Sequence, residues 1–254
     1  MRSLHTPTVV PSRGVVLLAE DNDYVRELMT SSLESAGYAV VSAADGEDVS
    51  TSGLLRAVAR ALGRPEEPFE FSFAGMVDPV IVTRGLEQLG VDPTEARVQG
   101  LLGSYVAVLE EEVEAAPRDA YRAHAGVVDV LEAVSRREGV AVGLGTGNIE
   151  RGARIKLEPL GLNPYFSFGG FGSDAAVRSE LLQAGADRGC RVLGCVDEPC
   201  RVVVIGDTPK DVEAAREMGA DCLAVATGGA TAEALAACNP ALLVDTLEDE
   251  RVLP

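Results

Sequence analysis

The residues most suited to chemistry are two aspartates placed four positions apart, Asp207 and Asp211. They follow Gly206 and residues 202–205, an apolar run of four β-branched side chains. Such a run is typical of a strand buried on both faces of a parallel sheet, and these sheets bind ligands beyond the carboxyl ends of their strands. Mg²⁺ is commonly held by one or two carboxylates together with phosphate oxygens of a substrate. We therefore expect Asp207 and Asp211 to hold Mg²⁺; the simpler alternative is that Asp207 only caps a helix.

A second predicted strand end carries hydrogen-bond donors instead of carboxylates. The apolar residues 140–144 lead into the segment Gly145-Thr146-Gly147-Asn148. Glycines let backbone N–H groups approach an anion, and the Thr146 hydroxyl can donate to a phosphate oxygen at the start of the next helix. Alone, the segment also fits a turn with a helix-capping residue. Beside a carboxylate site it favours phosphate binding by Thr146, Gly147 and Asn148.

The elements that must position these groups follow from periodicity. Strand and helix patterns alternate along the chain, which predicts an α/β fold with a Rossmann-like doubly wound parallel sheet. Residues 53–117 show only helical periodicity, and such an insert cannot complete a sheet. We interpret them as an inserted helical cap between residues 1–49, an extension that contributes a core strand, and residues 118–254, the α/β core. The strands expected in that core are residues 140–144, 166–168, 201–205, 222–225 and 242–244.

Composition limits the classes of function. The chain has 254 residues, of which 46% are hydrophobic, enough to bury a large core. A formal net charge of −18 without a run rich in Lys or Arg disfavours binding to nucleic acids or anionic membranes. It also repels phosphate, so a site for a small phosphorylated metabolite needs a local cation. We find no apolar stretch of membrane-spanning length and no signal-peptide core in residues 1–14, and we expect a cytoplasmic protein.

Several segments occur in a fixed order: Leu144-Gly145-Thr146-Gly147-Asn148, Ala153-Arg154-Ile155-Lys156-Leu157, Val204-Ile205-Gly206-Asp207-Thr208-Pro209-Lys210-Asp211 and Ala226-Thr227-Gly228-Gly229. Together they resemble the haloacid dehalogenase (HAD) superfamily, in the phosphoglycolate-phosphatase-like branch with a helical cap. The resemblance implies Mg²⁺-dependent hydrolysis of a small phosphate monoester through an aspartyl phosphate. It implies that Thr146 binds phosphate and that Asp207 and Asp211 bind the metal. Lys156 would neutralise the nucleophile and the phosphate, with Arg178 as an alternative basic residue.

The first catalytic motif of that family departs from its usual form. The family places a nucleophilic aspartate on the first core strand and an acid–base aspartate two positions later, in a pattern that resembles Asp-x-Asp-Gly-Thr. Residues 42–48 align with it, and Asp45 matches the second aspartate, which implies a catalytic and metal-binding role. Ala43 stands at the nucleophile position and Glu47 at the threonine position. Since a methyl group cannot attack phosphorus, this alignment predicts impaired or absent turnover.

Residues 15–49 resemble a different family, the opening strand–helix–strand of response-regulator receiver domains. Glu20 and Asp21 match the acidic pair that binds Mg²⁺ in receivers, but the resemblance ends before the phosphoacceptor aspartate. We infer that a receiver-like fragment replaces the first strand of the HAD core. Asp21-Asn22-Asp23 also has Asp-x-Asp spacing, so the strand before it could take the central position and present Asp21 as nucleophile and Asp23 as acid.

Three functional hypotheses remain open. The chain is a HAD-like phosphatase with impaired turnover, an inactive phosphate- and Mg²⁺-binding or interaction module, or a receiver-like phosphoacceptor in signalling. The substrate stays open because cap side chains, not core motifs, select it, and the oligomeric state also stays open. Met76 lies in a cap segment where the resemblance leads us to expect a basic residue, and we interpret it as a packing residue.

Cysteine usage gives one further expectation. Five cysteines, an odd number, favour a reducing compartment over a disulfide scaffold. Cys190, Cys195 and Cys200 recur at intervals of five, which raises the question of a metal site. Zinc sites typically use shorter spacings and four ligands, and no histidine lies nearby in the sequence. The spacing therefore does not favour metal binding.

Overall fold

The structure, a computed structural model, describes residues 14–20, 48–71, 73, 75–117, 121, 123–195, 200–228 and 230–252. For residues 14–20 and 48–52 it describes the backbone alone. The sequence-based assignments to Asp21, Asp23, Ala43 and Asp45 concern residues outside this described part of the chain.

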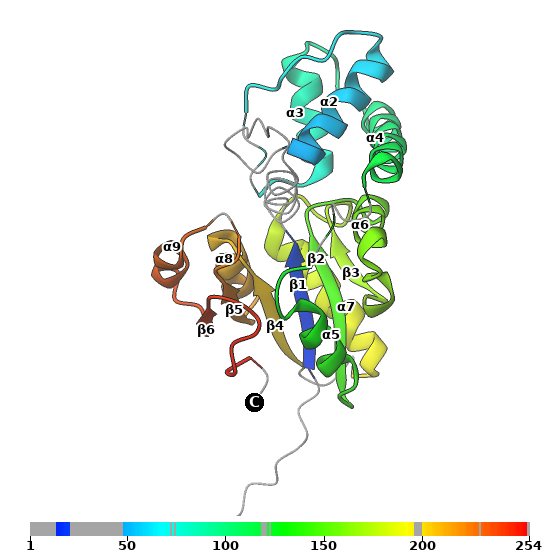
Figure 1. Cartoon of the computed structure of the whole chain (residues 1–254). Coiled ribbons are helices and arrows are strands. Elements are labelled where there is room, and N and C mark those ends of the chain that lie inside the picture. The colour runs from blue at the N-terminus through cyan, green and yellow to red at the C-terminus, as the bar shows by residue number, and fades with distance from the viewer. Residues whose placement is uncertain are drawn as a thin grey trace, which may run out of the picture.

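The described strands form one parallel six-stranded sheet in the order β3-β2-β1-β4-β5-β6 (Figure 1). They are β1 (Gly14–Glu20), β2 (Val140–Thr146), β3 (Gly169–Phe171), β4 (Arg201–Gly206), β5 (Asp221–Val225) and β6 (Leu242–Val244). The order changes direction at β1, because β2 and β3 lie on one side of it and β4 to β6 on the other. The predicted doubly wound α/β sheet is confirmed, and sheets of this kind bind ligands at the point where the order reverses.

The N-terminal segment supplies the strand at the centre of this sheet. β1 pairs with β2 on one side and with β4 on the other. Its last residue, Glu20, lies opposite Thr146 in the β1–β2 register. Since all these strands run in parallel, their carboxyl ends meet at one edge of the sheet. Asp21 is the next residue of the chain after β1.

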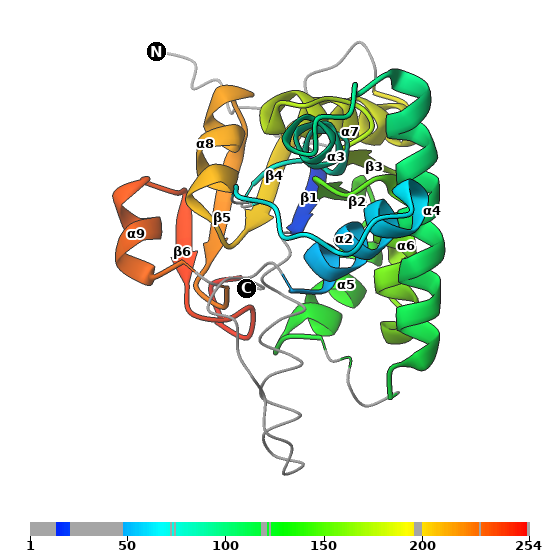
Figure 2. The same ribbon diagram turned by 90° about the horizontal axis from the view of Figure 1, so that it is seen from above.

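Helices cover both faces of the sheet. The helices α7 (Arg178–Leu193) and α8 (Pro209–Glu217) lie on one face, and α5 (Val127–Ser135) and α6 (Glu150–Leu157) on the other (Figure 2). Val204 packs in the apolar cluster under α7 and α8, whereas Ile205 packs in the cluster of α5 and α6. Because successive strand residues point to opposite faces, residues 202–205 of β4 have to be apolar. The remaining short elements are η2 (Glu158–Leu160), η3 (Asn163–Tyr165) and α9 (Ala232–Ala237).

The helices α2 (Asp48–Leu62), α3 (Asp78–Gln88) and α4 (Glu95–Ala115) form a helical module beyond the carboxyl ends of the strands (Figure 1). They pack around their own apolar cluster, in which Tyr105 is 0% exposed. The cluster includes Ile155 of α6, so it continues into the α/β part. None of the described helices combines the length and apolarity that crossing a membrane requires.

Two predicted elements are displaced. The strand predicted at residues 166–168 is wrong, since β3 begins at Gly169. A pair of glycines usually marks the end of a strand, but Gly169 and Gly170 lie within β3. A Cβ on Gly170 would overlap the carbonyl oxygen of Leu181, so only glycine fits at this position. Glycine therefore lets α7 pack directly on this edge strand. The helical pattern of residues 175–187 predicts a helix from residue 175, whereas α7 begins three residues later, at Arg178.

Candidate active site

The edge of the sheet at the ends of β2 and β4 carries the side chains singled out in the sequence. Thr146 ends β2 and is 0% exposed, and Asp207 follows β4 directly and is 8% exposed. Asn148, Lys156 and Asp211 are buried as well. Buried polar and charged groups are normally hydrogen-bonded, so their partners indicate what each group can do.

Thr146, Asn148 and Lys156 form a buried hydrogen-bonded chain. Asn148 donates to Oγ1 of Thr146 twice, from Nδ2 at 2.9 Å and from its backbone N–H at 3.1 Å. Nζ of Lys156 donates to Oδ1 of Asn148 at 2.5 Å. Because Oγ1 of Thr146 accepts two bonds, its own hydrogen points elsewhere and the hydroxyl is arranged as a donor. This chain of donors, which ends on a cationic side chain, suits an anion.

Asp78, the first residue of α3, connects the helical module to that chain. Its backbone N–H donates to the carbonyl oxygen of Gly147 at 2.9 Å, and its Oδ2 accepts from the backbone N–H of Ile149 at 2.8 Å. Burial raises the pKa of Asp78 to about 6, although the charge of Lys156 and the Ile149 hydrogen bond oppose this shift. Asp78 was not predicted from the sequence, because an acidic residue before proline is an ordinary helix start.

The carboxylate of Asp211 is engaged by donors of the protein. Oδ1 accepts from Nε of Arg178 at 2.7 Å. Oδ2 accepts from Thr208, from the hydroxyl at 2.7 Å and from the backbone N–H at 3.1 Å. Thr208 is also the N-cap of α8, and the two residues form a capping box. Asp211 therefore holds the start of α8 and Arg178 in place, and both of its oxygens already have partners.

Glycines allow the backbone to pack closely against the side chains of Asp207 and Asp211. A Cβ on Gly228 would overlap Oδ2 of Asp207, and a Cβ on Gly206 would crowd the side chain of Asp211. This close approach explains why the segment after β5 needs glycine at position 228. A buried carboxylate at the end of a parallel strand, with oxygen as its donor atom, fits a hard cation such as Mg²⁺.

Lys210 is a second residue near the site that was not predicted from the sequence. A Cβ on Gly75 would overlap Cδ and Nζ of Lys210, so this side chain of α8 lies against Gly75, the residue before Met76. A basic group was expected near Met76, and the core supplies it from the opposite side. No linear signal could have revealed this, because the two segments lie far apart in the sequence.

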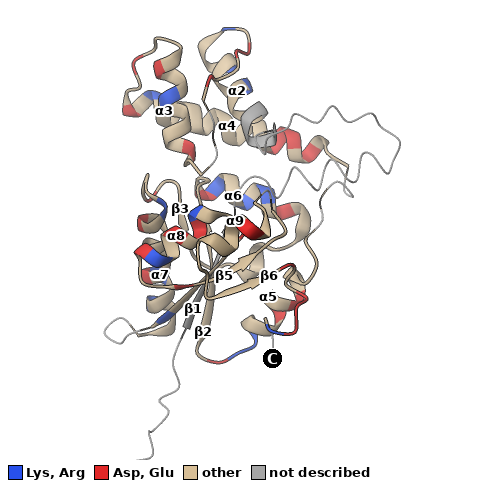
Figure 3. Cartoon of the chain, turned by 90° about the vertical axis from the view of Figure 1, so that its left-hand side faces the viewer, with Lys and Arg blue, Asp and Glu red and all other residues tan. Residues whose placement is uncertain are grey.

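The helical module also contacts the core through α4 and α6. Figure 3 marks basic positions on α6, close below the module. Arg151 of α6 forms an ion pair with Glu110 of α4 at 2.5 Å, and these side chains are 66% and 47% exposed. Exposed pairs contribute little free energy, so the buried bonds of Asp78 are the stronger link between the two parts.

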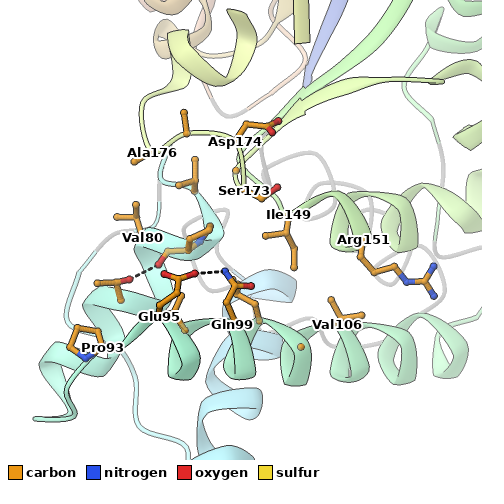
Figure 4. Close-up of a pocket in the computed structure, with 18 residues that line it drawn as sticks. Val80, Pro93, Glu95, Gln99, Val106, Ile149, Arg151, Ser173, Asp174 and Ala176 are labelled. Carbon is orange, nitrogen blue, oxygen red and sulfur yellow. Dashed lines mark hydrogen bonds between the residues drawn. The ribbon is translucent and has the colours of Figure 1, made fainter. Parts of the chain in front are cut away.

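A cavity of about 600 Å³ opens between the helical module and the loop after β3 (Figure 4). Glu95 and Gln99 of α4 line it on one side and are joined by a hydrogen bond of 2.9 Å. Ile149 and Asp174 line it on the core side. The cavity thus borders Ile149, the residue whose backbone N–H donates to Asp78.

Comparison with known proteins agrees with this geometry. Residues 180–250 match the family model described as HAD-hydrolase-like. A Dickeya dadantii (strain 3937) protein named "Probable phosphatase IndB" is 27% identical over 213 residues, which are 81% of this chain and 88% of that protein.

Solved structures share the fold at low sequence identity. A "predicted phosphoglycolate phosphatase" from Haemophilus somnus 129pt is 15% identical with a TM-score of 0.55, and the match covers 96% of this chain and 98% of that one. CbbY from Rhodobacter sphaeroides, solved in complex with phosphate, is 16% identical with a TM-score of 0.54, over 92% and 95% of the two chains. The family resemblance predicted from the motifs is confirmed.

Proposed function

We propose that this chain, whose residues 180–250 match a haloacid dehalogenase-like family model, is a Mg²⁺-dependent phosphatase that hydrolyses small phosphate monoesters through an aspartyl phosphate. The observation that carries this proposal is the position of β1. This strand is hydrogen-bonded between the strand that ends in Thr146 and the strand that leads to Asp207. A carboxylate directly after β1 would stand between a phosphate donor and a metal carboxylate.

Asp21 is our candidate nucleophile, with Asp23 as the acid–base residue. Asp21 follows Glu20, which lies opposite Thr146 in the sheet register. This assignment differs from the alignment that puts Ala43 and Asp45 in the first motif, and under it the chain retains a nucleophile. The central position of β1 supports the choice, because the family's nucleophile belongs to the first core strand.

The proposed reaction has two displacements at phosphorus. A carboxylate oxygen of Asp21 attacks phosphorus, the bond to the leaving oxygen breaks, and Asp23 gives its proton to that oxygen. Water then attacks the aspartyl phosphate and gives a proton to Asp23, which releases phosphate and restores the Asp21 carboxylate. Thr146 would donate to a phosphate oxygen, while Lys156 would offset its charge.

Asp207 is the described carboxylate best suited to hold Mg²⁺. Asp211 would orient the site through Arg178 and Thr208, because both of its oxygens already accept hydrogen bonds from them. Bound Mg²⁺ would neutralise phosphate charge in a chain whose formal net charge is −18. The helical module would serve as the cap, and its cavity beside Ile149 would receive the organic part of the substrate.

The test is hydrolysis of p-nitrophenyl phosphate with and without Mg²⁺. We expect Asp21→Asn and Asp207→Asn to lower kcat by about 100-fold or more, since each removes a group that acts in the reaction. Asp129→Asn, on the exposed face of α5, is the matched control and should leave the rate unchanged.

The alternatives give different results in the same assay. Full activity of Asp21→Asn would remove Asp21 from the mechanism. An inactive parent whose Ala43→Asp variant is active would support the alignment that places the nucleophile at position 43. If the parent and the Ala43→Asp variant are both inactive but still bind phosphate, the chain would be a binding module. Acyl phosphate on Asp21 that forms without turnover would favour the receiver-like phosphoacceptor.

A further inference from the structure

Three cysteine sulfurs converge at the opposite end of β4 from Asp207. The Sγ atoms of Cys190, Cys195 and Cys200 all lie within 4.8 Å of one another. We call them the three-cysteine cluster. Within the described part of the chain, it is the one group of three or more His, Cys, Asp or Glu side chains whose ligand atoms lie close enough together to bind a single metal ion.

The end of α7 produces the cluster. Gly194 follows α7 with φ of 66°, a left-handed conformation that reverses the chain. The backbone N–H of Cys195 then donates to the carbonyl oxygen of Cys190 at 2.9 Å, which folds Cys195 back onto the last turns of the helix. Cys200 directly precedes β4 and completes the group. A spacing of five, which looked too long for a metal site, is therefore bridged by the turn at Gly194.

The number of sulfurs distinguishes this cluster from a simple disulfide. Cys195 and Cys200 form a disulfide in the structure, and Cys190 is a free cysteine beside both of them. A disulfide requires two sulfurs, whereas a thiophilic cation gathers three or four. Tetrahedral Zn²⁺ with Zn–S bonds of about 2.3 Å places its sulfur ligands roughly 3.8 Å apart, within the span of this cluster.

We propose that the three cysteines, once reduced, bind one thiophilic divalent cation such as Zn²⁺ through three thiolates, with water or an added ligand in the fourth position. A phosphine reductant supplies the two electrons that convert the disulfide to two thiols; water supplies the two protons, and its oxygen is taken up as the phosphine oxide. Each thiol then gives up its proton as its sulfur binds the cation.

The surroundings agree with this assignment. Cys195 is 2% exposed, so its sulfur is shielded from solvent. Cys190 is partly buried beside it. Asp187 lies one turn before Cys190 on α7 and adds negative charge that favours a cation.

The cluster is separate from the proposed phosphatase site. Cys200 stands before the first residue of β4 and Asp207 after its last, so about 20 Å of strand separates them. Binding at the cluster can therefore be measured whether or not the chain hydrolyses phosphate esters.

The experiment titrates Co²⁺ into the full chain, reduced with a phosphine and kept free of oxygen. We expect thiolate-to-cobalt charge-transfer absorption that saturates at one equivalent and disappears when Zn²⁺ is added. Cys190→Ser and Cys200→Ser should each weaken binding by about tenfold or more, because each removes a ligand. The matched control is Cys238→Ser, which removes a cysteine outside the cluster and should leave the titration unchanged.

Circular dichroism of each variant separates loss of a ligand from loss of the fold. Absence of the charge-transfer band in the reduced, folded parent would overturn the proposal. Binding of equal strength in the folded Cys190→Ser and Cys200→Ser variants would also overturn it, since the ion would then bind elsewhere.

Discussion

The carboxylate of Asp78 accepts a hydrogen bond from the backbone N–H of Ile149 at 2.8 Å. Beside it, the backbone N–H of Asp78 donates to the carbonyl oxygen of Gly147 at 2.9 Å. One residue at the start of α3 therefore fixes the helical module against the loop that follows Thr146. This link joins the proposed cap to the proposed phosphate site, and it can be altered without changing a group assigned to catalysis.

Two substitutions of Asp78 should distinguish the effect of its hydrogen bond to Ile149 from the effect of its charge. Asp78→Asn keeps an acceptor oxygen for the Ile149 N–H, whereas Asp78→Ala leaves this buried donor unsatisfied. We expect Asp78→Ala to be less stable than Asp78→Asn by about 1–3 kcal/mol and to lose more phosphatase activity. Urea unfolding at pH 7 and the aryl phosphate assay measure the two effects. Equal stability of the two variants would mean that the hydrogen bond does not hold the module.

The raised pKa of Asp78 gives a pH dependence with a defined sign. Its pKa is about 6 in the folded chain, against an ordinary value of 3.8. Between these values the folded state holds a proton that the unfolded state has lost, so this group's contribution to stability falls as pH rises. Relative to Asp78→Asn, the parent should lose about 1 kcal/mol of unfolding free energy between pH 5 and pH 7. A difference that stays constant, or that grows with pH, would contradict the raised pKa.

The buried pair of Arg178 and Asp211 should matter far more than an exposed pair. Their side chains are 9% and 0% exposed, and Asp211→Ala would leave a buried guanidinium without its carboxylate and remove the capping box of α8. We expect a loss of about 3–5 kcal/mol in unfolding free energy. Arg201→Gln, which breaks the exposed ion pair with Asp221, is the control and should cost at most about 1 kcal/mol. Similar losses in both variants would show that the pair at Asp211 is not effectively buried.

The hydroxyl of Thr146 should be more important than its methyl group. Thr146→Val keeps the shape but removes the donor and the acceptor of two Asn148 bonds, whereas Thr146→Ser keeps the hydroxyl. We expect inorganic phosphate to inhibit the valine variant about tenfold or more weakly, because a charge-assisted hydrogen bond is lost, and to inhibit the serine variant nearly as well as the parent. Inhibition constants from the aryl phosphate assay decide this. Equal inhibition of all three proteins would exclude Thr146 as a phosphate donor.

Gly228 should be required for the position of Asp207. Gly228→Ala would place a Cβ onto Oδ2 of Asp207, so the carboxylate has to move and the concentration of Mg²⁺ that gives half-maximal activity should rise. Gly100→Ala in α4 is the matched control, because nothing lies within 4 Å of its Cβ. That substitution should raise stability by about 0.5–1 kcal/mol and leave the Mg²⁺ dependence unchanged. If the Mg²⁺ concentration for half-maximal activity is unchanged in Gly228→Ala, Asp207 does not bind the metal.

Local patterns were sufficient to predict most of the described sheet. Residues 202–205 are apolar because β4 is covered on both faces, and this two-sided burial appears in the sequence as an uninterrupted run. The ends of β2 and β4 were marked by Gly145 and Gly206, so Thr146 and Asp207 could be placed at one edge. The prediction failed at β3, where glycine meets the packing needs of a neighbouring helix and not those of a turn.

Only the tertiary structure decided how distant segments meet. It placed β1 between β2 and β4, the arrangement on which the proposed role of Asp21 rests. It also joined Asp78 to Ile149, 71 residues away, and laid Lys210 against Gly75. Periodicity records which face of an element is buried but not which element covers it. Contacts between elements depend on the packing of the whole chain, and they therefore leave no local signal in the sequence.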